Sequence, residues 1–128
     1  MMRYLFFLIL LVAGCESSVE NVAGKLSSEE MLARISSGNA PGVIDVRSQE
    51  EYQQGFIPGA LHVPHDKLED RLASLGLSRS EEIVVYCQSG GRAGKAEKIL
   101  LKQGFSNVKD LEGHWQAWVE NKLPVSKL

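Results

Sequence analysis

The sequence is poor in the residues that build disulfide frameworks and metal sites. Its 128 residues include two cysteines and three histidines. Two cysteines exclude a small fold held together by several disulfides. His62 and His65 are three residues apart with Pro64 between them, and this segment offers too few ligands to hold a metal ion. The sequence therefore predicts neither a disulfide scaffold nor a metal centre.

The sequence also lacks an excess of positive charge. It has 14 basic and 16 acidic residues and a formal net charge of −2 at pH 7. Such a balance gives no general attraction to nucleic acid or to anionic lipid, so no nucleic-acid partner is expected. No internal repeat or low-complexity block is visible, and the length suits a single domain, expected to act as a monomer.

The apolar run that opens the chain is too short to span a membrane as an ordinary helix. Residues 4–13 carry the Tyr4 hydroxyl as their one polar group and follow a short basic start at Arg3. Such a segment is typical of a secretory signal. It leads into Gly14 and Cys15, which resembles a bacterial lipobox, where small residues admit a signal peptidase and the cysteine thiol receives the lipid.

This pattern predicts a lipoprotein-type signal peptide at residues 1–14, a lipid-anchored linker at 15–25 and a folded domain at 26–128. Acyl chains on Cys15 would hold the protein on a membrane of the cell envelope, facing the periplasm. An ordinary cleaved signal and an uncleaved N-terminal anchor are the alternatives. Both leave the prediction for the folded domain unchanged.

Helix and strand signals alternate after the linker. Short β-branched or apolar runs predict strands, and apolar residues at helical spacing predict helices. The expected strands are residues 43–46, 60–63, 83–86 and a short one at Val108; the expected helices are 28–36 (N-cap Ser27), 49–54, 66–76 (N-cap Asp66), 92–103 and one around 115–119. This alternation predicts an α/β domain with a mostly parallel sheet and helices on both faces. Ligands bind such sheets at the carboxyl ends of the strands.

The loop at residues 87–92 joins the clearest strand to the following helix. Its cysteine, Cys87, comes directly after the strand, and Arg92 stands where the helix begins. A tight curve and a helix N-terminus direct backbone N–H groups inward and favour an anion. The residues expected to supply this nest are Gln88, Ser89, Gly90 and Gly91. With the positive charge of Arg92, the nest should favour the thiolate of Cys87, which is the nucleophilic form.

Two other interpretations of Cys87 stay open at this point. It could be an inert buried cysteine at the end of a strand. It could also form a disulfide with Cys15 in an oxidising compartment, unless Cys15 is acylated on sulfur. The combination of strand end, glycine pair, arginine and helix start within six residues favours the reactive thiol over both.

Three further segments stand in order with this loop. Asp45 to Glu51 follows an Asp-x-Arg-x-x-x-Glu pattern, residues 55–60 a Gly-x-Ile-Pro-Gly-Ala turn, and residues 113–118 a Gly-x-x-x-x-Trp closing helix. Together with the cysteine loop they resemble the rhodanese family of single-domain sulfurtransferases, over about residues 25–125. The N-terminal signal makes the small exported rhodaneses of the phage-shock type the most similar members. Phe56 and His114 depart from the pattern, which usually has His and Gly there, and Ala93 stands where many relatives have Ser. His114 is expected to cover the start of the closing helix.

The resemblance implies a thiosulfate sulfurtransferase that works without a metal or organic cofactor. The Cys87 thiolate would take the outer sulfur of thiosulfate, release sulfite, and pass the persulfide sulfur to cyanide or a thiol. Arg92 would steer the anionic donor. Asp45 and Arg47 are expected to form a structural pair that fixes the loop after their strand, although an acid/base role is conceivable for them.

Two functional alternatives accompany this interpretation. One is an envelope sulfur carrier or protein-binding module that keeps the loop but turns over little. The other is a phosphatase or arsenate reductase of the same fold. Four residues separate Cys87 from Arg92, whereas phosphatases that share this fold have five, and the shorter loop resembles that of the sulfur-transferring members.

Overall fold

The computed structural model describes residues 22–128. The predicted signal peptide, Cys15 and most of the predicted linker lie outside the described residues, so the expectations for them stay untested. Across 22–128, none of the helices combines the length and apolar character that a membrane crossing requires.

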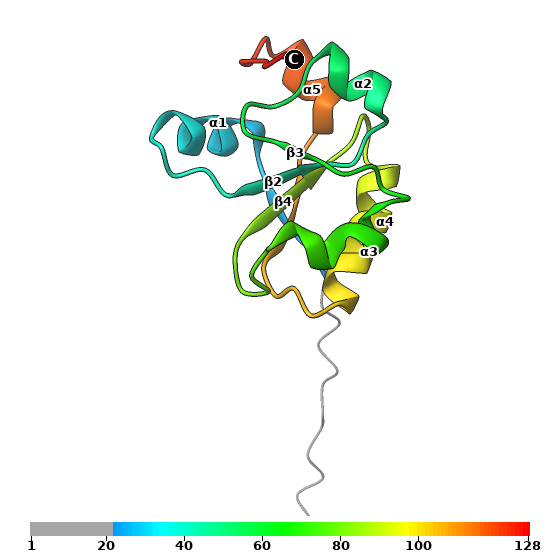
Figure 1. Ribbon diagram of the computed structural model, residues 1–128. Coiled ribbons are helices and arrows are strands. Elements are labelled where there is room, and N and C mark those ends of the chain that lie inside the picture. Colours follow the sequence, from blue (N-terminus) through cyan, green and yellow to red (C-terminus); the bar gives the residue numbers. More distant parts are fainter. Residues whose placement is uncertain (1–21) are drawn as a thin grey trace, which may run out of the picture.

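Five parallel strands form one central sheet (Figure 1). The strands are β1 (Gly24–Leu26), β2 (Gly42–Asp45), β3 (Leu61–His62), β4 (Ile83–Tyr86) and β5 (Val108–Leu111), and their order across the sheet is β1-β5-β4-β2-β3. All residues of β4 are fully buried, as expected for the central strand of a sheet covered on both faces. The predicted α/β class with a parallel sheet is confirmed.

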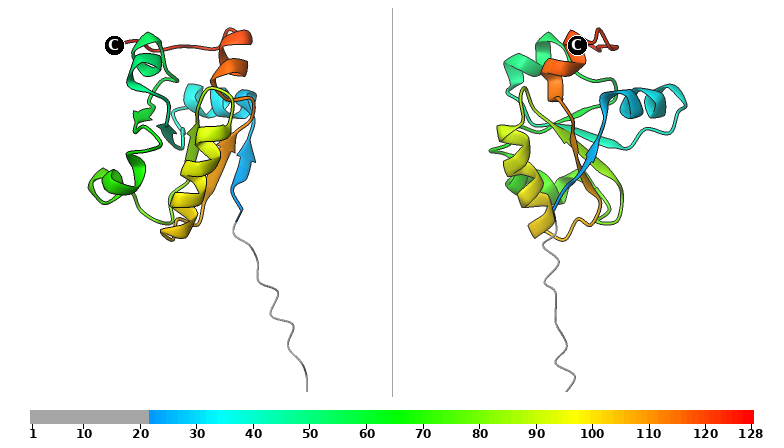
Figure 2. Two further views of the ribbon diagram at one scale, coloured as in Figure 1. Left: turned by 90° about the vertical axis from the view of Figure 1, so that its right-hand side faces the viewer. Right: turned by 180° about the vertical axis from the view of Figure 1, so that it is seen from behind.

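Helices cover both faces of the sheet. They are α1 (Ser28–Ser36), α2 (Gln49–Gln54), α3 (Leu68–Arg71), the 3₁₀ helix η1 (Leu72–Leu75), α4 (Gly91–Lys102) and α5 (His114–Glu120). The right-hand view of Figure 2 shows α1 and α4 on opposite sides. Alternate residues of β4 separate two cores: Val85 packs with Leu100 of α4, and Tyr86 packs with Met31 of α1 and Trp118 of α5.

The chain leaves β2 and β4 in opposite directions. From β2 it continues through α2 to the edge strand β3, and from β4 through α4 to β5 on the other side. Neighbouring strands whose connections diverge leave a crevice at their carboxyl ends, where ligands bind in open α/β sheets. Asp45 of β2 lies beside Tyr86 of β4, so this crevice opens next to Cys87.

Serine caps explain why two of the helices begin where they do. Ser27 accepts the backbone N–H of Glu30 at 3.1 Å and caps α1, as predicted. In α2 the cap is reciprocal, because Ser48 accepts from the Glu51 N–H and the Glu51 carboxylate accepts from the Ser48 N–H. This second cap holds Glu51 at the edge of the crevice.

Several predicted boundaries are wrong. The helix expected to have Asp66 as its N-cap begins at Leu68, with Lys67 at its N-cap and no side-chain cap. Gly24 and Lys25, assigned to the linker, form β1 with Leu26 because their backbone pairs with β5, which requires no apolar side chain. The strand expected at residues 60–63 is shorter, because β3 is an edge strand with two paired residues.

Candidate active site

The sulfur of Cys87 lies beneath the loop formed by residues 87–92. The backbone N–H groups of Gly90 and Ala93 donate hydrogen bonds to Sγ at 3.0 and 3.4 Å. The tight curve depends on Gly90, whose φ of 124° is in the region that favours glycine. Cys87 is 1% exposed. Of the residues expected to form the nest, Gly90 donates to the sulfur, and the second donor is Ala93, which was not expected to take part. The sulfur lies at the bottom of the loop rather than at its surface.

The environment of Cys87 favours the thiolate. Burial raises the pKa of the thiol, but hydrogen bonds from His114 and from the backbone N–H groups of Ala93, Gly90 and Ser89 outweigh burial and lower the pKa from 9.0 to about 7. A substantial fraction of Cys87 is therefore ionised at neutral pH. This is the chemical state that a nucleophile or a sulfur carrier requires.

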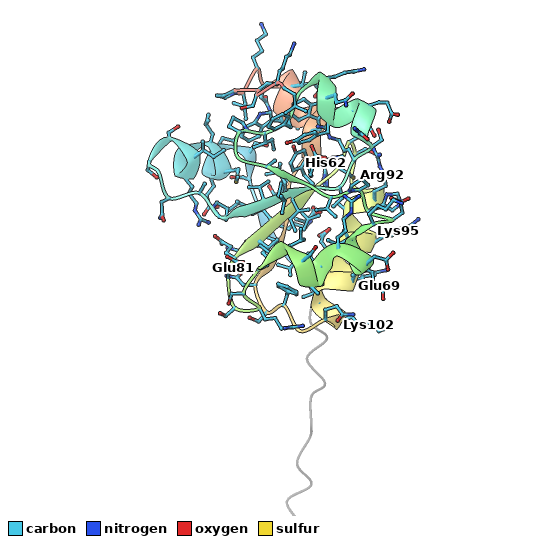
Figure 3. The ribbon with its side chains drawn as sticks, in the orientation of Figure 1. His62, Glu69, Glu81, Arg92, Lys95 and Lys102 are labelled. Atoms are coloured by element: carbon cyan, nitrogen blue, oxygen red, sulfur yellow. The ribbon has the colours of Figure 1, made fainter. Side chains whose placement is uncertain are left out.

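Arg92 does not supply a free positive charge to this loop, which corrects the sequence-based expectation. Its guanidinium binds both carboxylate oxygens of Glu51, at 2.6 and 3.0 Å, and this hydrogen bond with Arg92 lowers the pKa of Glu51 to about 2. Figure 3 shows Arg92 at the upper end of α4, away from Lys102 at its lower end. The pair ties α2 to the start of α4 and leaves the ionisation of Cys87 mainly to hydrogen bonds.

Asp45 and Arg47 form a buried ion pair below the crevice. Arg47 Nε and Nη2 donate to the Asp45 carboxylate at 3.0 and 2.7 Å, and Nη2 also donates to the Gly55 carbonyl at 2.7 Å. The Tyr86 hydroxyl donates to Asp45 Oδ2 at 2.6 Å and accepts from the Ile57 N–H at 3.1 Å. These contacts join β2, β4 and the turn after α2, so the pair is structural.

The start of α5 holds the loop from behind. The backbone N–H groups of Trp115 and Gln116 donate to the carbonyl oxygens of Cys87 and Gln88 at 3.0 and 3.2 Å. The Trp115 ring lies 4.3 Å from the guanidinium carbon of Arg47, an arrangement that adds cation–π attraction. The closing helix recognised in the sequence therefore positions the carbonyl side of the cysteine loop.

Phe56, which departs from the family pattern, takes part in an aromatic stack. Its ring lies 4.2 Å from the Tyr52 ring, and the Tyr52 ring lies 4.4 Å from that of His62. His62 Nε2 in turn lies 2.8 Å from the Arg47 carbonyl oxygen. Phe56 thus packs under the crevice and supports the segment that follows β2.

A groove of about 450 Å³ opens beside the loop. Gln88 of the loop lines it together with Trp115, Val119, Val125 and Lys127. The groove combines an apolar wall with two basic residues, Arg47 and Lys127, and one acidic residue, Glu51. It has room for a molecule larger than a small inorganic anion.

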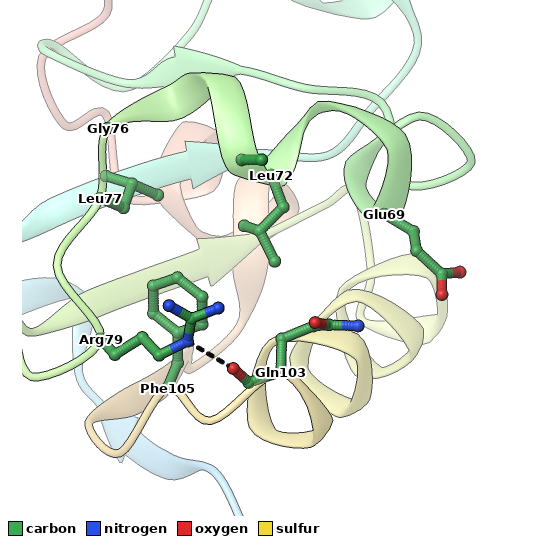
Figure 4. A pocket seen from close by; sticks show the side chains of 8 residues that line it. Glu69, Leu72, Gly76, Leu77, Arg79, Gln103 and Phe105 are labelled. Carbon is green, nitrogen blue, oxygen red and sulfur yellow. Dashed lines mark hydrogen bonds between the residues drawn. The ribbon is translucent and has the colours of Figure 1, made fainter.

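A second hollow of about 330 Å³ lies at the other end of α4 (Figure 4). There Arg79 Nε donates to the Gln103 carbonyl at 2.7 Å, and its guanidinium lies 5.7 Å from the centre of the Phe105 ring. None of the described residues that line this hollow carries a thiol. The carboxyl end of the sheet, with Cys87, is therefore the candidate site.

Three titratable residues behind the loop were not recognised as part of the site. His114 lies next to Cys87, whose backbone N–H points at Nδ1 from 3.3 Å, while Nε2 lies 3.3 Å from Asp110 Oδ1. Glu97 of α4 is 6% exposed, and its Oε2 has no hydrogen-bond partner. The sequence signal was His114 itself, at a position where the family pattern has glycine, but its expected role was to cover a helix start.

Glu97 is predicted to make the protein less stable at high pH. Burial and the negative charge of Asp110 raise the pKa of Glu97 from 4.5 to about 8. The folded state then binds more protons than the unfolded state between these values, so the free energy of unfolding falls as the pH rises through this range. We expect Glu97→Gln to be more stable than the wild type at pH 8 by about 1–3 kcal/mol, and to lose this advantage at pH 4.

Urea denaturation at the two pH values measures this effect. Glu69→Gln, which removes an exposed carboxyl on α3, controls for the loss of one negative charge. Equal stability of Glu97→Gln and wild type at pH 8 would contradict the assignment of a protonated Glu97.

Comparisons with known proteins agree with this architecture. Residues 27–121 match the model of the rhodanese-like domain. Thiosulfate sulfurtransferase 16, chloroplastic, of Arabidopsis thaliana is 42% identical over 94 residues, which are 64% of this chain and 77% of the relative. Thiosulfate sulfurtransferase PspE of Escherichia coli is 34% identical over 70 residues, 55% of this chain and 67% of the relative. The solved structure of the human single-domain sulfurtransferase TSTD1 has a TM-score of 0.70 and 30% identity, covering 77% of this chain and 97% of that one.

The family match spans the site as well as the fold. It includes the cysteine loop, the Asp45–Arg47 pair and the start of α5. The parallel sheet, the loop after β4 and the relatives' sulfurtransferase activity lead to one assignment. The chain belongs to the rhodanese-like domain family and is, in general terms, a sulfurtransferase.

Proposed function

We propose that the protein carries a sulfane sulfur atom as a persulfide on Cys87, taking it from an anionic donor such as thiosulfate and passing it to a thiol or to cyanide. The observation that carries this proposal is the pair of N–H groups, from Gly90 and Ala93, that bind the Cys87 sulfur. They stabilise the negative charge of the Cys87 thiolate, which attacks the donor in the first step and is formed again when the sulfur leaves.

The proposed reaction has two displacement steps. In the first, the Cys87 thiolate attacks the outer sulfur of thiosulfate, the sulfur–sulfur bond of the donor breaks, and sulfite leaves with the electron pair. In the second, a thiolate or cyanide attacks the outer sulfur of the persulfide and the Cys87 thiolate returns. Charge and sulfur balance in both steps, and neither needs an oxidant. With a pKa of about 7, Cys87 is readily ionised at neutral pH. It can therefore act both as the attacking nucleophile and as the leaving group.

The donor and the acceptor have different access to the sulfur. With Cys87 1% exposed, the donor must be small and must enter through the loop. Lys127 at the groove would attract such an anion. The groove beside Gln88, with its apolar wall, suits a larger thiol as acceptor.

Mass spectrometry of the intact protein tests this proposal. Incubation with thiosulfate should add about 32 Da, the mass of one sulfur, to Cys87, and addition of cyanide should remove it and yield thiocyanate. A Cys87→Ser variant treated in parallel should gain no mass. If the wild-type chain gains no sulfur from thiosulfate or from another sulfane donor, the proposal is wrong.

The same measurement separates an enzyme from a carrier module. The burial of Cys87 favours slow exchange with solvent molecules. A stable adduct that is formed without efficient production of thiocyanate would therefore assign the protein as a sulfur carrier with little turnover.

We also propose that the protein acts as a lipid-anchored monomer of the cell envelope, facing the periplasm. This part rests on the sequence, through the apolar run at residues 4–13 and the Gly14–Cys15 step that follows it. The intact mass of the mature protein from membranes should begin at Cys15 and include its acyl groups. A mature protein that begins elsewhere or carries no lipid would contradict the anchor.

A further inference from the structure

A chain of four titratable side chains runs behind the sulfur-binding loop. Cys87 follows β4, His114 begins α5, Asp110 belongs to β5 and Glu97 to α4. The His114 ring lies against the loop so closely that a Cβ at Gly90 would stand 3.1 Å from Nε2. His114 is 6% exposed. Its imidazole is therefore held between the sulfur site and the sheet, out of contact with bulk water.

The backbone of His114 is strained. Its φ is +52°, a conformation that residues with a side chain rarely adopt. Glycine, the usual residue of the family pattern at this position, would adopt it freely. Strain of this kind persists where the surrounding structure requires a particular side chain, and it is common at functional sites. The contacts of the imidazole show what this side chain does.

The two ring nitrogens of His114 have different partners. Nδ1 accepts the backbone N–H of Cys87, so in this arrangement Nδ1 carries no proton. Nε2 then carries the ring proton and lies 3.3 Å from Asp110 Oδ1. The contact at Nδ1 is 3.3 Å long, which is longer than an ordinary N–H hydrogen bond. The loss of this long hydrogen bond therefore costs little free energy when Nδ1 gains a proton and turns to the neighbouring sulfur.

We propose that His114 is the proton acceptor for the Cys87 thiol, with Asp110 holding the ring through Nε2. The proton leaves Sγ, the S–H bond breaks, and an N–H bond forms at Nδ1, so that a thiolate and an imidazolium face each other. A thiol, an imidazole and a carboxylate in this order form the arrangement that activates cysteine nucleophiles in general. The inference deepens the proposed function, because the thiolate it produces is the one that would accept sulfur.

The charges around the pair agree with this assignment. The neighbouring His114 side chain is the largest of the causes that lower the pKa of Cys87. Burial lowers the pKa of His114, but Asp110 and Cys87 outweigh burial and raise it to about 9. Between these two values the thiolate and the imidazolium coexist. Lys25 of β1 acts on Asp110 by its charge and not on His114 itself.

Glu97 and Asp110 together carry a single negative charge. The raised pKa of Glu97 leaves it protonated at neutral pH, and in that form it helps to lower the pKa of Asp110. Asp110 is therefore the one carboxylate of the two that carries negative charge toward His114. A second negative charge at Glu97 would raise the pKa of Cys87 and oppose its ionisation.

The test is the pH dependence of Cys87 alkylation by iodoacetamide in the full chain, read at the Cys87 peptide by mass spectrometry. The wild-type rate should rise with an inflection near pH 7. In His114→Gly, which suits the backbone, the inflection should move up by at least one pH unit, so that the rate at pH 7 falls at least about fivefold while the rates converge at pH 10. Asp110→Asn should shift the profile in the same direction by less. His65→Gln, which removes a histidine elsewhere, should leave it unchanged.

Two outcomes would overturn the proposal: a His114→Gly profile that superimposes on the wild type, or, should that variant not fold, an Asp110→Asn profile that does so. A second readout is the imidazole titration of His114 by NMR, whose pKa should fall by at least about one unit in Cys87→Ser, because the thiolate partner is gone. A role in packing alone would leave this value unchanged. If the alkylation profiles shift as expected but Cys87 takes up no sulfur, the proposed function is wrong and the role of His114 stands. If the profiles superimpose and Cys87 takes up sulfur, the role of His114 is wrong and the proposed function stands.

Discussion

Replacing Cys87 by serine is expected to lower the rate of sulfur transfer from thiosulfate to cyanide by at least about 10³-fold, because the loss of a covalent nucleophile removes both steps of the reaction. A serine hydroxyl is not ionised at neutral pH, and an oxygen cannot hold sulfane sulfur in the same way. The fold should survive, since serine is close in size to cysteine and the N–H groups of Gly90 and Ala93 can donate to its oxygen. The measurement is thiocyanate production at saturating thiosulfate.

Cys15→Ser is the matched control for this experiment. It removes the other cysteine of the chain, and the purified variant in detergent should keep the wild-type rate. A Cys87→Ser variant that retains more than a tenth of the activity would show that Cys87 is not the sulfur carrier. Loss of activity in Cys15→Ser would instead point to a functional bond between the two cysteines.

Replacing Arg47 by methionine is expected to reduce the free energy of unfolding by about 3–5 kcal/mol, because breaking one side of a buried ion pair leaves the other charge without its partner. Asp45 and Arg47 are 0% and 1% exposed. The variant also leaves the Gly55 carbonyl without the Arg47 donor. Urea denaturation followed by circular dichroism measures the change.

Arg34→Met provides the comparison for Arg47→Met. Arg34 pairs with Glu82 at the surface, with about a quarter of its side chain exposed, and exposed pairs contribute less than about 1 kcal/mol. Similar losses in the two variants would contradict the structural role of the Asp45–Arg47 pair. Conversely, a double variant with Asp45→Asn should recover part of the loss, because the uncompensated charge is removed.

The alternation of short apolar runs and helical stripes was sufficient to predict the α/β class, the parallel sheet and the limits of α2. These features follow from local patterns, because side-chain periodicity and capping serines act within a few residues. The cysteine loop was predicted for the same reason, since a strand end, glycines and a helix start are adjacent in the chain. The lipobox-like segment was also interpreted from residues that are adjacent in the chain, and the lipid anchor stays a prediction.

The contacts between site residues that are far apart in the chain could not be predicted from local patterns. Arg92 was expected to bring free charge to the sulfur, but it binds Glu51, 41 residues away along the chain. His114 was expected to cover a helix start, yet it contacts Cys87 across 27 residues. Contacts between residues 41 or 27 positions apart leave no periodic pattern in the sequence from which they could be predicted.

The sequence by itself therefore determined the kind of fold and the family and predicted Cys87 as the reactive residue, while the tertiary structure decided which groups surround the Cys87 sulfur. The physical reason is the range of the interactions. Strand, helix and loop preferences depend on neighbours along the chain, whereas hydrogen bonds and charge pairs depend on which strands lie side by side. Only the order β5-β4-β2 brings His114, Cys87 and the Asp45–Arg47 pair to one edge of the sheet.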